Sequence, residues 1–242
     1  MSEAASSPTN GPNLSAEPAA TNPRRLQADA PPDAASYSSQ GAVFERFAIR
    51  ELLEKWVLYR DAGEWGSFAT VWHDDGYMMA TWFQGSATEF IRISREGFEK
   101  GVNILHLLGG TAMQLERTRA IAQTKMTISQ RASVEGVPCD VLCTGRFYDF
   151  LEKRQDEWRI VLRRLIYEKD RLDVVDPSKT LSLDTQLLES FPVGYRHLAY
   201  LQTKIGYTVK KNLPGLHGPE VQALYGYGAK WLATGSLGGA KD

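Results

Sequence analysis

Large apolar side chains are rare in residues 1–41 and become frequent from residue 43 onward. The first segment consists mainly of Ala, Ser, Pro, Asn and Gly. A segment of this composition cannot bury enough apolar surface to offset the entropy that it loses on ordering. The pattern therefore predicts a disordered N-terminal tail over residues 1–41 and a folded part that begins near residue 42.

Three helices are expected at the start of the folded part. Residues 43–63 carry apolar side chains at three- and four-residue spacing, which is typical of an amphipathic helix. A shorter helix is expected over residues 64–73, followed by a turn at Asp74-Asp75-Gly76 and a strand over residues 77–83. Ser86 is expected to cap a third helix, which ends before Gly101.

Strand-like stretches dominate the middle of the chain. They cover residues 111–115, 120–134, 139–153 and 157–170, and a tight connection joins the last two. Helices followed by a long, curved antiparallel sheet predict an α+β fold for a main domain over residues 42–178. Residues 179–242 are expected to form a helical extension, with helices over residues 191–211 and 219–232. This extension is expected to pack on the mouth of the main domain or on a neighbouring subunit.

Composition and charge exclude several classes of protein. The 242 residues are 43% hydrophobic and 24% charged, which is ordinary for a soluble globular protein. A net charge of -1 gives no electrostatic reason to expect a nucleic acid or an anionic membrane as partner. The chain has no membrane-spanning apolar run and no hydrophobic signal core, so a cytoplasmic protein is expected. Cys139 and Cys143 are expected to be reduced core residues. No Gly-rich dinucleotide motif, phosphate loop or metal-ligand pattern occurs, so we expect neither a cofactor nor a metal.

Asp61 and His106 are the strongest candidates for chemistry. Asp61 closes the first predicted helix, and His106 is one of only four histidines and lies among apolar neighbours. A carboxylate that holds a neutral imidazole in one tautomer makes it a proton-abstracting base. Without such a partner, a buried histidine is more often a hydrogen-bonded core residue.

Two segments, residues 48–76 and 145–164, resemble the SnoaL-like branch of the NTF2-like superfamily. The resemblance rests on AIRELL followed by Asp61, VWHDD ten residues after it, the histidine in ILHLLGG, and W-x-x-x-x-R in the last strand. It covers roughly residues 43–175 and is nearest to the hexachlorocyclohexane dehydrochlorinase type, with scytalone and bile-acid dehydratases more distant. It implies a cone-shaped curved sheet, closed at one end by helices over an apolar pocket.

The resemblance also implies roles for individual residues. Asp61 matches the carboxylate that orients the base, His106 matches the base, and Arg163 matches an arginine that faces the pocket and stabilises negative charge. Strand alternation by itself leaves Arg164 as an alternative to Arg163. The relatives carry a lysine or tyrosine five residues before the aspartate, and Trp56 replaces it here, which disfavours halide release.

Further candidates for substrate binding are Trp56, Tyr59, Trp72, Arg146 and Tyr148. For each of them core packing is the alternative. An apolar pocket lined by aromatic side chains would suit a ring-bearing substrate.

Together these observations predict a cofactor-independent lyase that performs a dehydratase-type elimination on a small apolar cyclic metabolite, such as a polyketide, terpenoid or steroid-like compound. His106 would remove a proton beside an activating group. An isomerase or cyclase with the same base is one alternative, and a non-catalytic binding or assembly protein of the same fold is another. Relatives form dimers and trimers, so a homodimer or homotrimer is expected.

Overall fold

The computed structural model describes residues 39–242. The predicted tail therefore lies outside the described residues, except for residues 39–41, which belong to the first helix. In chain order the elements are α1 (Ser39–Ala62), α2 (Trp65–Thr70), β1 (Trp72–Met79), β2 (Gln84–Ser86), α3 (Ala87–Glu99), β3 (Asn103–Glu116), β4 (Arg119–Val134), β5 (Val137–Arg154), β6 (Glu157–Val174), α4 (Thr185–Glu189), the 3-10 helix η1 (Val193–Tyr195), α5 (Arg196–Lys204) and α6 (Pro219–Thr234).

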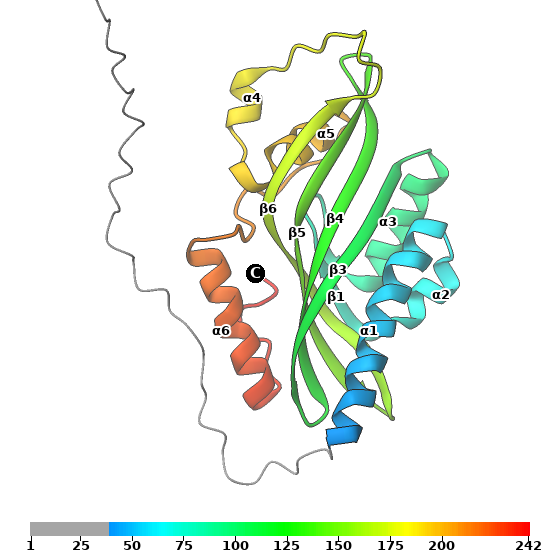
Figure 1. The fold of residues 1–242 in the computed structure, drawn as a ribbon, viewed down its shortest axis with the longest axis vertical. Coiled ribbons are helices and arrows are strands. Elements are labelled where there is room, and N and C mark those ends of the chain that lie inside the picture. The colour runs from blue at the N-terminus through cyan, green and yellow to red at the C-terminus, as the bar shows by residue number, and fades with distance from the viewer. Residues whose placement is uncertain (1–38) are drawn as a thin grey trace, which may run out of the picture. The chain divides into compact units, whose positions relative to one another are not determined.

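The strands form one curved six-stranded sheet in the order β2-β1-β6-β5-β4-β3 (Figure 1). Strands β3 to β6 are 14 to 18 residues long and pair as successive antiparallel hairpins. The predicted α+β fold with a curved sheet is confirmed. One pair departs from the antiparallel expectation, because β1 runs parallel to β6. No hairpin joins these two strands, so local sequence does not fix their relative direction.

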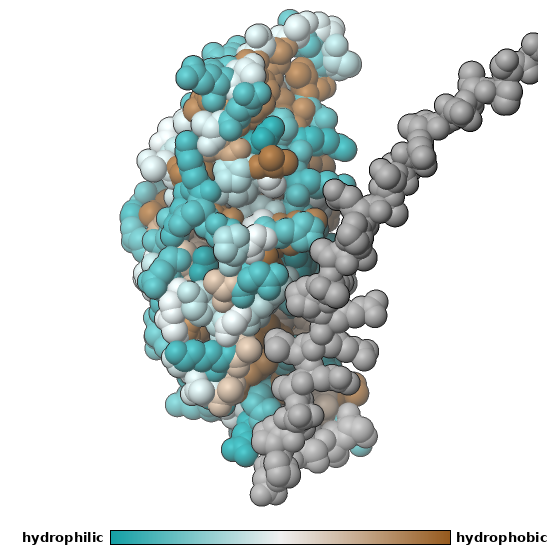
Figure 2. Space-filling model, turned by 90° about the vertical axis from the view of Figure 1, so that its left-hand side faces the viewer, coloured by the Kyte–Doolittle hydropathy of each residue, from teal (hydrophilic) through white to brown (hydrophobic). Residues whose placement is uncertain are grey.

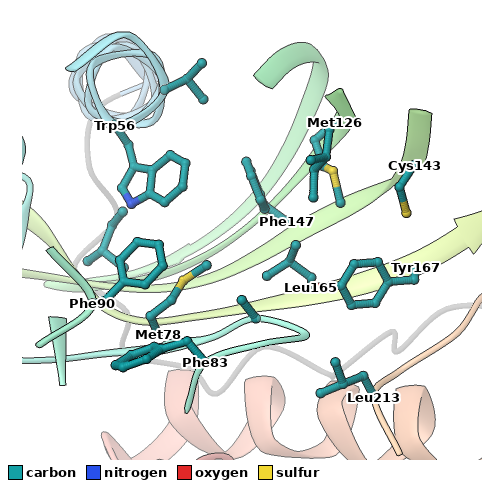
Figure 3. Close-up of a cluster of buried hydrophobic side chains, with 14 of the residues drawn as sticks. Trp56, Met78, Phe83, Phe90, Met126, Cys143, Phe147, Leu165, Tyr167 and Leu213 are labelled. Carbon is teal, nitrogen blue, oxygen red and sulfur yellow. The ribbon is translucent and has the colours of Figure 1, made fainter. Parts of the chain in front are cut away.

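Helices α1, α2 and α3 cover one face of the sheet, and their apolar side chains form the main core (Figure 1). Trp56 points from α1 into this layer toward Phe90 and Phe147 (Figure 3), with ring centroids 6.3 and 5.4 Å away. Helix α5 belongs to the same core through Leu198 and its neighbours. The C-terminal extension therefore completes the core of the main domain.

Helix α6 packs on the opposite face of the sheet. Val221, Leu224 and Trp231 form a second cluster with Tyr148 and other strand residues. The side of the molecule that carries α4 and α6 in Figure 1 is mostly hydrophilic, with hydrophobic residues in small separate areas (Figure 2). Helix α6 thus covers apolar sheet surface that would otherwise face water.

Several predicted boundaries are wrong. Asp74-Asp75-Gly76 does not form a turn but lies inside β1, and the second helix already ends at Thr70. The cause is pairing with β6: Trp72 lies opposite Ile160 and Tyr77 opposite Leu162, so the residues between them bulge out of the ladder.

The region around His106 and the C-terminal extension also differ from expectation. The strand predicted over residues 111–115 is longer and contains His106. The helix predicted over residues 191–211 is divided into η1, α5 and an irregular segment that starts at Gly206, whose φ of +97° ends helical geometry. The predictions of the Ser86 cap and of the helix over residues 219–232 are confirmed.

Candidate functional site

Asp61 and His106 form a buried pair between the last turn of α1 and strand β3. His106 Nδ1 lies 2.8 Å from Asp61 Oδ1, and the backbone N–H of His106 donates to Asp61 Oδ2 at 2.6 Å. The side chain of His106 is 7% exposed and that of Asp61 is 11% exposed. An ionised carboxylate only accepts hydrogen bonds, so Nδ1 carries the ring proton and Nε2 carries the lone pair.

The electrostatic surroundings keep this pair in the form that a base requires. Burial lowers the pKa of His106, Asp61 opposes the shift, and the charges of Arg60 and Arg163 lower the pKa further. Burial raises the pKa of Asp61, but hydrogen bonds from His106 and the charges of His106 and Arg60 together bring it below its ordinary value. At neutral pH the imidazole is therefore neutral and the carboxylate is ionised.

A small cavity of about 30 Å³ lies beside His106. Its apolar wall includes Met78, Phe90 and Leu165, and its polar wall includes Arg60, Gln130 and Gln202. A water molecule takes up about 30 Å³ in the liquid, whereas ligand sites measure about 300 Å³ or more. The cavity as it stands thus has room for water and not for a cyclic metabolite.

The C-terminal extension closes this cavity. Gln202 on α5 accepts a hydrogen bond from Thr81 Oγ1 at 2.6 Å and donates one to Gln130 Oε1 at 3.2 Å. Leu198, one helical turn earlier, also lines the cavity. These side chains connect α5 to the sheet and to the segment that follows β1.

Arg163 lies on the His106 side of the sheet but does not line the cavity. It is fully buried, with Nε 2.6 Å and Nη2 3.0 Å from the two carboxylate oxygens of Asp149. The Arg163 guanidinium also lies 4.2 Å from the Trp56 ring and 4.0 Å from the Phe147 ring. This arrangement is an internal ion pair between aromatic rings, with no face open to a ligand.

Arg164 points to the opposite face, where its Nη1 donates to the Ala240 carbonyl at 2.8 Å. Strict alternation along the last strand would place Trp158 on the same face as Arg164. A bulge at Val161 reverses the alternation, since Leu151 pairs with Ile160 while Phe150 pairs with Leu162.

Of the five predicted substrate-binding residues, only Trp56 lines the cavity. Its ring meets the His106 ring edge-on at 5.4 Å. Trp72 is buried in the aromatic core behind Trp56, and Tyr59 is a half-buried residue at the border of that core. Core packing is the role that their positions support.

Arg146 and Tyr148 lie on the far face of the sheet, so the structure does not bring them to His106. Arg146 bonds Glu168 and Tyr225, and the Tyr148 ring packs 5.7 Å from that of Tyr225. The physical reason is strand alternation: Phe147, between them, points to the cavity, and its two neighbours must point away.

Arg60 and Gln202 also line the cavity, and neither was predicted from the sequence. Arg60 directly precedes Asp61, but successive helix residues point about 100° apart, and only its long side chain brings its guanidinium back to the carboxylate. Gln202 lies outside the segment that resembles the family, so no motif indicated it.

Within residues 39–242, no group of three or more His, Cys, Asp or Glu residues is placed to hold a metal ion. No helix in this range is both long and apolar enough to cross a membrane. Cys139 and Cys143 are buried free thiols, and burial raises the pKa of Cys143 well above its ordinary value.

Comparisons with solved structures find similar backbones at low sequence identity. A putative scytalone dehydratase from Novosphingobium aromaticivorans has a TM-score of 0.49 and 14% identity, and the match covers 60% of this chain and 100% of that one. A hexachlorocyclohexane dehydrochlorinase also has a TM-score of 0.49, with 13% identity over 61% of this chain and 99% of the other.

Sequence comparisons are closer. Pea pathogenicity protein 2 of Fusarium vanettenii is 38% identical over 175 residues, which are 71% of this chain and 75% of that protein. An uncharacterized protein of Emericella nidulans is 33% identical over 237 residues, which are 91% of this chain and 97% of that protein. The family model of the SnoaL-like domain matches residues 42–164, the part that holds α1, the whole sheet up to the middle of β6, and both members of the Asp61–His106 pair. The resemblance drawn from the sequence motifs is thereby confirmed, and the chain belongs to the SnoaL-like family.

Proposed function

We propose that this chain is a cofactor-independent lyase that eliminates water from a small, largely apolar cyclic metabolite. The observation that carries the proposal is the Asp61–His106 pair, in which the carboxylate accepts from both Nδ1 and the backbone N–H of one histidine. Two bonds to one carboxylate set the position and the tautomer of the ring. The family relation supports enzymatic chemistry of this general kind.

In the proposed reaction, Nε2 of His106 removes a proton from a carbon beside a carbonyl group of the substrate. The electron pair of that C–H bond forms a C=C bond, and the C–O bond to a hydroxyl group on the adjacent carbon breaks. The imidazolium returns its proton to the departing hydroxyl, which leaves as water, and neutral His106 is regenerated. Asp61 stabilises the imidazolium while it exists.

Tyr167 and the Arg163–Asp149 ion pair would assist. Tyr167 lines the cavity, and burial raises its pKa well above the ordinary value, so its hydroxyl stays protonated. This hydroxyl hydrogen-bonds with Thr81 and would turn to donate to an oxygen of the substrate when one enters. Arg163 and its partner Asp149 would act indirectly, since the Arg163 charge lowers the pKa of His106. Substrate entry requires the 30 Å³ cavity to widen, and α5 forms one of its walls.

The test compares the wild-type protein with His106→Asn on a panel of hydroxylated cyclic ketones, with products followed by mass spectrometry. We expect a product lighter by one water molecule with the wild type and a rate lower by about 10²- to 10⁴-fold with His106→Asn. His217→Asn is the matched control, because His217 is exposed. Undiminished elimination by His106→Asn would contradict the proposal.

The same base permits an isomerase or cyclase, and that alternative predicts products of unchanged mass. A non-catalytic binding or assembly protein is a second candidate, and the small volume of the cavity favours it. It predicts no turnover of any panel member by the wild-type protein at any concentration.

A further inference from the structure

Arg60 is a cavity-lining cation whose hydrogen-bonding capacity is only partly used. The residue is 7% exposed and lines the same cavity as His106. Its Nη1 donates to Asp61 Oδ1 at 3.2 Å and to the Ile104 carbonyl at 3.3 Å, both long distances. No hydrogen bond joins its Nε or Nη2 to any residue in the described range 39–242, and Nε is buried without a partner.

The unused Nε–Nη2 edge is the one that other arginines of this protein use to hold a carboxylate. Arg163 binds Asp149 through Nε at 2.6 Å and Nη2 at 3.0 Å. Arg131 binds Asp140 through the same two nitrogens, at 2.7 and 2.6 Å. The two N–H groups on this edge are parallel and match the two oxygens of a carboxylate.

No other side chain of the cavity offers a positive charge to a ligand. Among the described residues that line it, Arg60 and His106 are the ionisable groups with a basic side chain, and burial keeps His106 neutral. Arg163 is enclosed behind the Trp56 and Phe147 rings and is held in an ion pair by Asp149. Asp61 is already satisfied by two bonds from His106, so it leaves the free edge of Arg60 available.

We infer that the Nε–Nη2 edge of Arg60 binds a carboxylate group of the ligand that enters the His106 cavity. The consequence for the reaction rests on the proposed function: the substrate is then an apolar cyclic metabolite that carries one carboxylate. Binding of the carboxylate beside Asp61 would orient the ring of the substrate toward Nε2 of His106. Met78, Phe90 and Leu165 would contact the apolar part of the substrate. Because Nε is shielded from solvent, the edge becomes accessible as the cavity widens.

The test uses formate, the smallest carboxylate, and formamide, a neutral molecule of nearly the same shape. ¹H–¹⁵N spectra of the full chain are recorded during titration with sodium formate at constant ionic strength, then with formamide. With the wild type we expect saturable shifts of the Asp61 and His106 amide signals with formate and none with formamide. Arg60→Met should weaken formate binding on the order of tenfold or more, while Arg60→Lys, which keeps a point charge, should retain part of it.

Arg95→Met is the matched control, since Arg95 is exposed on α3 and forms its ion pair with Glu99 in the same helix. It should bind formate like the wild type. The inference is overturned if wild-type protein shows no saturable response, if formamide acts like formate, or if Arg60→Met binds formate unchanged. If Arg60→Met does not fold, unchanged formate affinity of Arg60→Lys overturns the bidentate geometry.

The two proposals fail separately. Formate binding involves no turnover, so Arg60-dependent binding in a protein that dehydrates no panel member supports the carboxylate subsite and overturns the lyase. Turnover that depends on His106, in a protein with no formate response, supports the lyase and overturns the subsite.

Discussion

Replacing Asp61 with Asn tests whether the carboxylate sets the tautomer of His106. The side-chain amide can still accept from the His106 backbone N–H through Oδ1, the contact that measures 2.6 Å in the native protein. It then presents an N–H group to Nδ1, where the native protein has an acceptor at 2.8 Å. We expect the ring to adopt the other tautomer, with the proton on Nε2, which removes the base.

The expected loss of stability follows from the hydrogen bond that His106 no longer makes to an ionised carboxylate. Removal of a charged acceptor from a buried hydrogen bond costs about 1.5–3 kcal/mol of unfolding free energy. For a domain of this size each kcal/mol lowers Tm by about 2–4 °C, so a fall of roughly 3–12 °C is expected. The pKa of His106 should fall further, because Asp61 raises it in the native protein.

Urea unfolding measured by tryptophan fluorescence gives the free energy, and ¹⁵N shifts of the imidazole report the tautomer. Asp173→Asn is the control, since Asp173 is half exposed in a surface ion pair with Arg171 and should change stability by about 0.5 kcal/mol or less. Unchanged stability of Asp61→Asn, with the Nδ1-protonated tautomer retained, would refute the reasoning.

Four other predictions concern the ion pair, pH, helix packing and assembly. Arg163→Met should destabilise the protein by about 3–5 kcal/mol, because it leaves a buried carboxylate without its partner; urea unfolding checks this, and a loss below 1 kcal/mol would argue against the ion pair. Because burial lowers the pKa of His106 in the folded protein, the unfolded chain binds one more proton than the folded protein below about pH 6.5. The contribution of neutral His106 to the free energy of unfolding is therefore complete above that pH and declines below it. His106→Asn should therefore show a shallower fall in unfolding free energy between pH 7 and about pH 5 than the wild type, and an identical slope would count against the shift. Gly228→Ala should loosen α6, since an added Cβ would lie 1.9 Å from the Tyr148 hydroxyl, whereas Gly226→Ala, with open space around it, should stabilise the helix by up to about 1 kcal/mol; thermal unfolding of both variants checks this, and equal Tm values would contradict the packing. We also expect a homodimer or homotrimer, because β3 forms an unpaired edge of the sheet, and light scattering that gives the mass of one chain would exclude it.

Local signals account for most of the elements that the sequence predicted correctly. Ser86 caps α3 by accepting from the backbone N–H of Glu89, a contact that depends on neighbours within four residues. The apolar spacing of α1 and the long strands β4 to β6 likewise report local periodicity. Local signals did not predict strand pairs whose partners are far apart in sequence. Strand β1 pairs in parallel with β6, and the residues expected to form a turn lie inside β1.

The candidate site shows the same division between local and long-range information. Asp61 and His106 were identified from the order of short motifs, and the fold brings them within hydrogen-bonding distance. The orientation of Arg163 was not predictable, because the bulged residue Val161 decides which faces Arg163 and Arg164 occupy.

The sequence by itself thus determined the fold class, the family and the two residues of the proposed base, since each depends on periodicity or on the order of motifs along the chain. Only the tertiary structure decided which side chains surround that base. It placed Arg146 and Tyr148 on the far face, enclosed Arg163 with Asp149, and brought Arg60 and Gln202 to the cavity. The physical reason is that cavity walls are assembled from α1, the sheet and α5 together, and bulges and long side chains in these elements decide which polar atoms meet.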